Sequence, residues 1–110
     1  FKIIHCDQFQ TEGIDKIVKR IRDRVGNNPL YLSIDIDVLD PAFAPGTGTP
    51  EVAGMTTREI VNVIRGLSGL NIISADVVEV APAYDHAEVT SLAAATIVYE
   101  LTNLFAKVKG

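Results

Sequence analysis

The sequence predicts an α/β fold in which helices cover both faces of a mainly parallel sheet, giving three layers. Short apolar runs alternate along the chain with longer segments of helical periodicity. The run at residues 30–34 is apolar almost without interruption, which is typical of a strand buried on both faces. Carboxylates follow two of these runs, at the edge where parallel strands end and where such folds bind ligands.

The first part of the chain contains a predicted strand, a helix and a second strand. Residues 1–5 form a short apolar run that we interpret as a strand. From Thr11 to Val25, apolar side chains recur every three or four residues, and the Gly-Asn-Asn-Pro sequence at 26–29 ends this amphipathic helix. The next strand occupies residues 30–34, so the helix forms a crossover between parallel strands.

The second part begins with a long loop and continues as helix, strand and helix. Prolines and glycines crowd residues 40–54, a density that excludes a helix or a central strand. Loops of this length in small domains are often functional. Thr56 and Glu59 have the spacing of a capping box and begin a helix. A strand pattern follows at 71–80, and an alanine-rich helix extends from Ala87.

Length and composition predict one domain over residues 1–110 and exclude several functions. A chain of 110 residues suits a single core and is too short for two ordinary domains. The net charge is -4 and the basic residues are dispersed, which argues against nucleic-acid binding. No apolar run reaches about 20 residues, so we expect no membrane span. A single cysteine excludes an internal disulfide and favours an intracellular location, cytoplasmic or mitochondrial.

Asp35 and Asp37 form the first candidate functional cluster. If the backbone stays extended, both carboxylates project from the same face, with Cα atoms about 7 Å apart. Two like charges this close repel each other unless a cation lies between them. Carboxylate oxygens select hard ions such as magnesium, manganese or calcium, so we expect a metal site here. Asp40, which precedes Pro41, is better explained as a turn residue.

A second candidate group follows the later strand pattern. Glu79 at its end could act as an acid or base, as a metal ligand or as the partner of a cationic substrate, and the pattern does not choose among these roles. Asp76 falls on the opposite face and is interpreted as a structural hydrogen-bond acceptor that caps a neighbouring loop. Asp85 and His86 either approach the same edge or cap the last helix.

Three segments together resemble the ureohydrolase (arginase/agmatinase) family. They are SIDIDVLDP at residues 33–41, AFAPGTGTPE at 42–51 and DVVEVAPAYD at 76–85. Their order and spacing agree with the family pattern, and the likeness extends over nearly the whole chain. The sequence of residues 79–86 resembles the agmatinase branch more closely than the true arginases. The resemblance implies an arginase-like fold, of which this chain would be the C-terminal part of a single domain.

The resemblance also implies a reaction and roles for four residues. The family uses a binuclear manganese site at which hydroxide attacks a guanidinium carbon and urea leaves, with agmatine as the expected substrate and putrescine as the amine product. Asp35 would bridge the metals and Asp37 would be a ligand of one ion. Thr49 and Glu79 would contact the substrate, Glu79 by accepting hydrogen bonds from the guanidinium group. A complete protein would form a homo-oligomer and act on a small guanidino molecule.

The sequence departs from the family pattern in two ways. Glu51–Gly54 replaces the usual Pro-Gly-Gly after the Thr-Pro turn. No segment before residue 35 resembles the family's His ligand or its Asp-x-His-x-x-x-Asp cluster, so the chain contains two carboxylate ligands and no catalytic histidine. We therefore expect these 110 residues alone to release little or no urea.

Two alternatives compete with the hydrolase. In a phosphatase of the haloacid dehalogenase type, Asp35 would be the nucleophile and Asp37 the acid or base. That chemistry needs a downstream lysine and a Gly-Asp pair, whereas Lys107 and Lys109 are the only lysines after Asp37 and no Gly-Asp occurs. The second alternative is a non-catalytic, truncated relative that assists folding or assembly.

Overall fold

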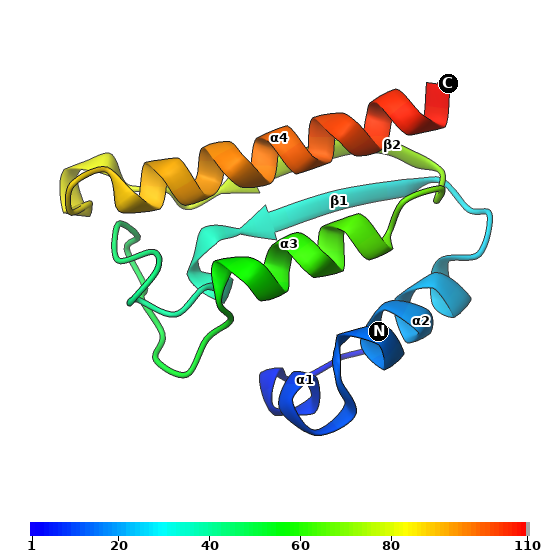
Figure 1. Cartoon of the computed structure of the whole chain (residues 1–110), viewed down its shortest axis with the longest axis horizontal. Coiled ribbons are helices and arrows are strands. Elements are labelled where there is room, and N and C mark those ends of the chain that lie inside the picture. Colours follow the sequence, from blue (N-terminus) through cyan, green and yellow to red (C-terminus); the bar gives the residue numbers. More distant parts are fainter. Residues whose placement is uncertain (110) are drawn as a thin grey trace.

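The computed structural model describes the backbone of residues 1–109. Figure 1 shows a parallel pair of strands with the long helix α4 and the shorter helix α3 alongside, and with α1 and α2 beyond α3. The elements, in which η denotes a 3-10 turn, are α1 (Cys6–Glu12), α2 (Ile14–Val25), β1 (Leu30–Asp35), η1 (Ile36–Val38), α3 (Thr57–Gly66), β2 (Ile72–Val78), η2 (Pro82–Tyr84) and α4 (Val89–Lys109).

The sheet confirms the predicted parallel pairing. Strands β1 and β2 run in the same direction, with Ile34 opposite Val77 and Asp35 opposite Val78. Helix α3 lies between them in sequence and makes the crossover, as the βαβ pattern predicts. Because both strands end together, Asp35 and the residue after Val78 lie at one edge of the sheet.

In the described chain, the helices lie on one face of this sheet. Helix α4 contacts β2 and α3, and α3 contacts α2. Tyr31 and Ser33 point to the other face, are exposed, and donate their hydroxyl hydrogen bonds to Asp76. Asp76 is therefore the structural acceptor that its position predicts, although it bonds the neighbouring strand rather than a loop.

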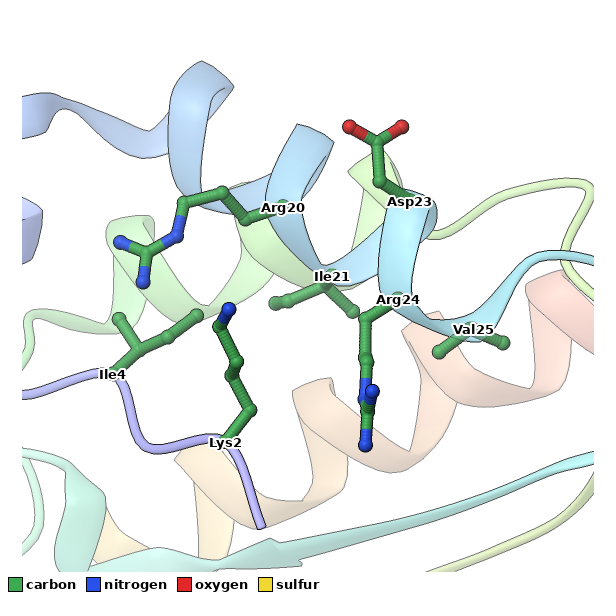
Figure 2. A pocket seen from close by; sticks show the side chains of 7 residues that line it. All are labelled: Lys2, Ile4, Arg20, Ile21, Asp23, Arg24 and Val25. Atoms are coloured by element: carbon green, nitrogen blue, oxygen red, sulfur yellow. The ribbon is translucent and has the colours of Figure 1, made fainter.

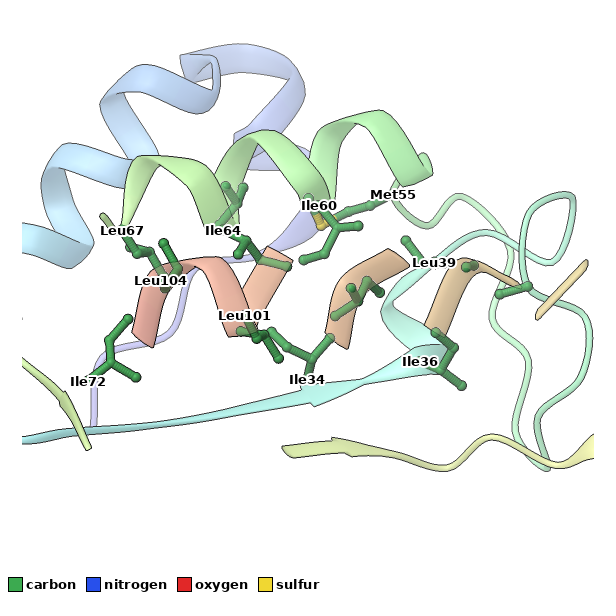
Figure 3. Packing of buried hydrophobic residues seen from close by; sticks show 14 of the residues in the cluster. Ile34, Ile36, Leu39, Met55, Ile60, Ile64, Leu67, Ile72, Leu101 and Leu104 are labelled. Carbon is green, nitrogen blue, oxygen red and sulfur yellow. The ribbon is translucent and has the colours of Figure 1, made fainter. Parts of the chain in front are cut away.

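The core lies between the sheet and helices α3 and α4 (Figure 3). Burial of apolar surface stabilises the fold by about 25 cal/mol for each Å² removed from water. The capping box at the start of α3 forms as predicted, since Thr56 Oγ1 accepts from the Glu59 amide at 3.1 Å and Glu59 Oε1 accepts from the Thr56 amide at 3.0 Å. The least exposed apolar side chains are Ile17, Ile36, Leu39, Ala44, Ile64 and Ile97.

The N-terminal segment differs from its prediction. Residues 1–5 form no strand, because a strand requires a hydrogen-bonded neighbour and β1 pairs with β2 alone among the described residues. The helix expected from Thr11 instead begins earlier and is divided into α1 and α2 at Gly13, where φ is 84°. A hydrogen bond of 2.7 Å from the His5 amide to Gln8 Oε1 closes the first turn of α1.

Helix α4 differs from the expectation that no segment is long and apolar enough to span a membrane. By length and composition alone, Val89–Lys107 is one stretch of 19 residues that would suffice to cross a membrane. Its inner side packs in the core through Ala93, Ile97 and Leu101. In the same stretch, the buried Glu100 accepts two hydrogen bonds from Arg65 of α3, at 2.6 and 3.0 Å. These contacts place one side of α4 against the core, while Leu92, Val98 and Tyr99 on the other side are exposed.

Candidate active site

Asp35 and Asp37 lie at the carboxyl end of β1, where the chain turns. The backbone does not stay extended as expected, because residues 36–38 form the 3-10 turn η1 and Asp35 Oδ1 accepts the Asp37 amide at 3.1 Å. Both carboxylates are half-buried. A strand-like projection from one face is therefore wrong, but the turn keeps the two carboxylates adjacent at the edge of the sheet.

Thr49 lies beside Asp37. Its hydroxyl donates a 2.8 Å hydrogen bond to Asp37 Oδ2, across twelve residues of loop. A threonine hydroxyl that donates one hydrogen bond still has lone pairs that can accept another. The structure thus brings together three of the predicted site residues, with Thr49 holding Asp37 and keeping its acceptor capacity.

Glu79 follows β2 directly, one residue beyond the partner of Asp35. Its φ is 68°, a left-handed conformation that costs a residue with a Cβ about 1–2 kcal/mol. The side chain is exposed and the chain leaves the strand direction at this point. The sequence predicts the position of Glu79 at the edge of the sheet, but it contains no signal for this strained backbone. Such strain is concentrated at functional sites, where surrounding structure holds it.

The loop at residues 40–54 is closed by its own hydrogen bonds. Asp40 Oδ1 accepts the Ala42 amide at 2.9 Å, which confirms the interpretation of Asp40 as a turn residue. The amides of Asp40 and Met55 donate to the carbonyls of Met55 and Val38, both at 2.9 Å. A Cβ on Gly54 would lie 2.6 Å from the Asp40 nitrogen, so the two ends of the loop meet at a glycine.

Asp85 caps helix α4, as one of its two predicted roles requires. Its Oδ1 accepts the amides of His86 and Thr90, both at 2.9 Å, and its Oδ2 accepts the amide and hydroxyl of Ser91 at 3.0 and 3.1 Å. Burial raises the pKa of Asp85, but the hydrogen bonds from Ser91, Thr90 and His86 outweigh it and hold that pKa far below its usual range. His86 is exposed in the same loop.

Thr47 is a buried polar residue of the loop that no sequence motif marks. It is 3% exposed, and its Oγ1 is buried without a hydrogen-bond partner in the described chain. A buried hydroxyl that lacks a partner costs stability. The sequence does not distinguish the buried Thr47 from the exposed Thr49, two residues later. The path of the loop backbone decides which of the two threonines is buried.

The donors at the carboxylate edge fit part of a metal site. Among residues 1–109, no group of three or more His, Cys, Asp and Glu side chains converges. Asp35 and Asp37 together offer oxygen donors at one place, which is the chemistry that manganese, magnesium and calcium require. The two carboxylates therefore suit a hard divalent cation as a part of its ligand set.

A pocket of about 380 Å³ lies elsewhere and lacks this chemistry (Figure 2). It is formed where the N-terminal segment passes α2 and shares no lining residue with the carboxylate edge. Arg20 in this pocket is already paired with Glu12 at 3.0 Å. Its one carboxylate, Asp23, is already paired with Lys19 at 2.6 Å. The lining residues are Lys2, Ile4, Arg20, Ile21, Asp23, Arg24 and Val25.

Comparison with known proteins identifies relatives of the whole chain. An agmatinase from Enterobacter sp. is 49% identical over 110 residues, which cover 100% of this chain and 36% of that protein. A Schizosaccharomyces pombe protein provisionally named agmatinase 1 is 62% identical over 107 residues, covering 97% of this chain and 27% of that protein.

Two solved structures superpose closely on the fold. A hypothetical agmatinase from Burkholderia thailandensis has a TM-score of 0.96 at 45% identity, over 99% of this chain and 35% of that one. The proclavaminate amidino hydrolase of Streptomyces clavuligerus has a TM-score of 0.95 at 42% identity, over 97% of this chain and 36% of that one.

The chain thus spans about a third or less of the length of the relatives that it matches. The fold of this chain therefore corresponds to part of the fold of those structures. The model of the family described as the arginase family matches residues 1–103. With that match and these structural neighbours, the chain belongs to the arginase family.

Proposed function

We propose that the full-length protein hydrolyses a guanidino compound, with agmatine as the substrate, and releases urea and putrescine. The observation that carries the proposal is the carboxylate edge, where Asp35, Asp37 and Thr49 at the end of β1 adjoin Glu79 at the end of the paired strand β2. The relatives named agmatinase support the choice of substrate.

In this proposal Asp35 and Asp37 hold manganese together with ligands from outside the described residues. When bound, the metal pair would supply a strong nucleophile near neutral pH by lowering the pKa of water. Asp37 is kept in place by the hydrogen bond that it accepts from Thr49, and Asp35 by the hydrogen bond that it accepts from the Asp37 amide. These contacts fix the orientation of both carboxylates before a metal binds, which lowers the entropy lost on binding.

Glu79 and Thr49 bind the substrate. A guanidinium group is planar and carries N–H donors in pairs, which a carboxylate such as Glu79 accepts in a charge-assisted, bidentate geometry. Thr49 donates to Asp37 and can still accept one N–H from the same guanidinium group. The substrate carbon then lies between the Glu79 side and the metal side of the edge. No residue of this chain is assigned as the acid or base.

The other interpretations make different demands on this edge. A haloacid dehalogenase-type phosphatase would require a fold that the arginase-family match does not support. A non-catalytic relative would have the same family membership without turnover, and the experiment below separates it from the hydrolase. An intracellular location and a homo-oligomeric complete protein remain predictions, as does the absence of nucleic-acid and membrane partners.

The experiment uses the full-length protein, stripped of metal and then loaded with manganese. Urea release from agmatine is measured beside release from arginine and from a guanidino acid. We expect turnover of agmatine that disappears on chelation and returns with manganese. Turnover of another guanidino compound in place of agmatine would overturn the choice of substrate. A fully metal-loaded protein that releases no urea from any of them would overturn the hydrolase and favour the non-catalytic relative.

A further inference from the structure

Gly46 connects the two loops that carry the candidate site residues. Its amide donates a 2.7 Å hydrogen bond to Thr90 Oγ1, and its carbonyl accepts a 2.8 Å hydrogen bond from the Ala81 amide. A Cβ on residue 46 would lie 2.9 Å from the Cα of Asp85, so the loop backbone lies directly against Asp85. We call Gly46, Ala81, Asp85 and Thr90 the Gly46 junction.

The α4 side of the Gly46 junction is firmly held. Thr90 is 0% exposed and lies in the first turn of α4. The four hydrogen bonds that Asp85 accepts fix this turn, including one from the Thr90 amide. The donors His86 and Thr90 lie on either side of Ala87 and Glu88, which have φ values of 50° and 61° that residues with a Cβ rarely adopt. The helix start is therefore a rigid support for Gly46.

Short segments lead from the Gly46 junction to both sides of the site. Thr49, which bonds Asp37, is three residues beyond Gly46 along the loop. Glu79 is two residues before Ala81 on the segment that leaves β2. Gly46 therefore links the segment that leads to Thr49 and Asp37 with the segment that leads to Glu79.

We propose that Thr90 and Asp85 are positioning residues, which act through Gly46 to set the separation between the carboxylates of Asp37 and Glu79. The inference rests on the proposed hydrolysis of a guanidino compound. A substrate held at one end by Glu79 reacts beside Asp37, so both groups must lie at one fixed spacing. A misplacement of about 1 Å in such a site can reduce turnover by up to about a hundredfold.

The first test replaces Thr90 in the full-length, manganese-loaded protein. Thr90→Val keeps the shape of the side chain and removes the oxygen that accepts the Gly46 amide. We expect kcat/KM for agmatine to fall about tenfold while bound manganese is unchanged, and Thr90→Ser to restore it. The matched control is Thr102→Val on the same helix, whose hydroxyl donates a 2.8 Å hydrogen bond to the Val98 carbonyl. Equal kinetics for Thr90→Val and the control would overturn the proposal.

A double-mutant cycle separates positioning from a general loss of stability. If Thr90 acts by placing Glu79, its replacement should matter little once Glu79 no longer carries a charge. We therefore expect Thr90→Val to lower kcat/KM less than twofold in a Glu79→Gln background, against about tenfold in the wild type. An equal loss in both backgrounds would mean that Thr90 supports the fold alone, and would overturn the positioning role.

Two further measurements keep the test decisive. If Thr90→Val does not fold, Ser91→Ala removes a single hydrogen bond to Asp85 and should lower kcat/KM about threefold, with the same dependence on Glu79. No loss in Ser91→Ala would then overturn the proposal. Hydrogen exchange of the Gly46 amide should accelerate in either variant. If wild-type protein releases no urea, the proposed function has failed, whereas active wild type with unaffected variants means that the positioning role has failed.

Discussion

The carboxylate edge and the helix-covered core are held by different forces. In the core, Ile64 and Ile97 are almost fully buried among apolar side chains from the sheet and from both helices. At the edge, Asp37 and Asp85 are held by hydrogen bonds from Thr49 and from the first turn of α4. Apolar packing stabilises the fold without regard to direction, whereas hydrogen bonds fix the orientation of a few polar groups.

The backbone differs between these regions in the same sense. The described non-glycine residues with positive φ are Ala53, Glu79, Ala87 and Glu88, and all lie in the loops at the edge. Each such residue costs of order 1–3 kcal/mol, which the packed region must offset. The free energy gained by packing the core thus offsets the cost of the unfavourable backbone conformation of Glu79. Substitutions in the two regions should therefore separate activity from stability.

The largest expected effect is the loss of activity in Asp37→Ala. We expect the full-length variant to bind less manganese and to hydrolyse agmatine about a thousandfold more slowly, because a metal ligand and the partner of Thr49 are both lost. Thermal unfolding of the metal-free protein should change little, since Asp37 is only half-buried. Metal analysis and a urea assay measure the effect.

The control for Asp37 is Asp23→Ala on α2. Asp23 is exposed and bonds Lys19 at 2.6 Å, an i,i+4 surface pair worth a few tenths of a kcal/mol. Its replacement should leave manganese content and urea release at wild-type levels. Full metal binding and activity in Asp37→Ala would show that the edge is not the metal site.

The core counterpart is Ile64→Ala on α3. Ile64 is 0% exposed, so truncation leaves a cavity and should lower the free energy of unfolding by about 3 kcal/mol. The smaller change Ile64→Val should lower it by about 1 kcal/mol. We expect both variants to keep near-wild-type kcat/KM well below their melting temperatures. A loss of activity in the folded Ile64→Ala protein would contradict the separation of core from edge.

The third effect concerns Glu79→Gln. The amide keeps the size and the strained backbone of Glu79 and removes its charge, so kcat/KM for agmatine should fall about thirtyfold, equivalent to about 2 kcal/mol. Bound manganese should not change. Glu51→Gln is the control, because Glu51 is an exposed carboxylate in the loop that carries Thr49. If Glu79→Gln had wild-type kinetics with agmatine, Glu79 would have no part in substrate binding.

The sequence predicted those elements of the fold whose signal lies within a single segment. The apolar run at 30–34 and the Thr56 capping box correspond to β1 and the start of α3 because these signals are local. The prediction of a strand at residues 1–5 was wrong because an apolar run forms a strand only when another strand lies beside it, which the local sequence does not specify. Helical periodicity does not reveal the break at Gly13, because the segments on both sides of it are helical.

For the site, the sequence was sufficient to locate the carboxylates but not to orient them. Asp35 and Glu79 could be placed because parallel strands end at one edge. The turn at 36–38, the positive φ of Glu79 and the tie between Gly46 and Thr90 join residues through loop conformation. Such contacts cross up to forty-four residues and leave no periodic pattern to read.

The smallest expected effect is on the pH dependence of stability, and it tests the ion pair between the exposed Arg65 of α3 and the buried Glu100 of α4. Two side-chain hydrogen bonds from Arg65 lower the pKa of Glu100, while burial opposes them. The unfolded chain therefore takes up a proton more readily than the folded one. The stabilisation is fully present above the ordinary pKa of 4.5 and is lost as the pH falls below it.

Glu100→Gln removes this titration and keeps an oxygen that can accept from Arg65. We expect the variant to be less stable than the wild type at pH 7, and the difference in melting temperature to shrink as the pH falls toward 3. Glu12→Gln should change stability less at either pH, because its pair with Arg20 is about a third exposed on both sides. If the difference in melting temperature between the wild type and Glu100→Gln stayed constant with pH, then packing rather than charge would account for the contribution of Glu100 to stability.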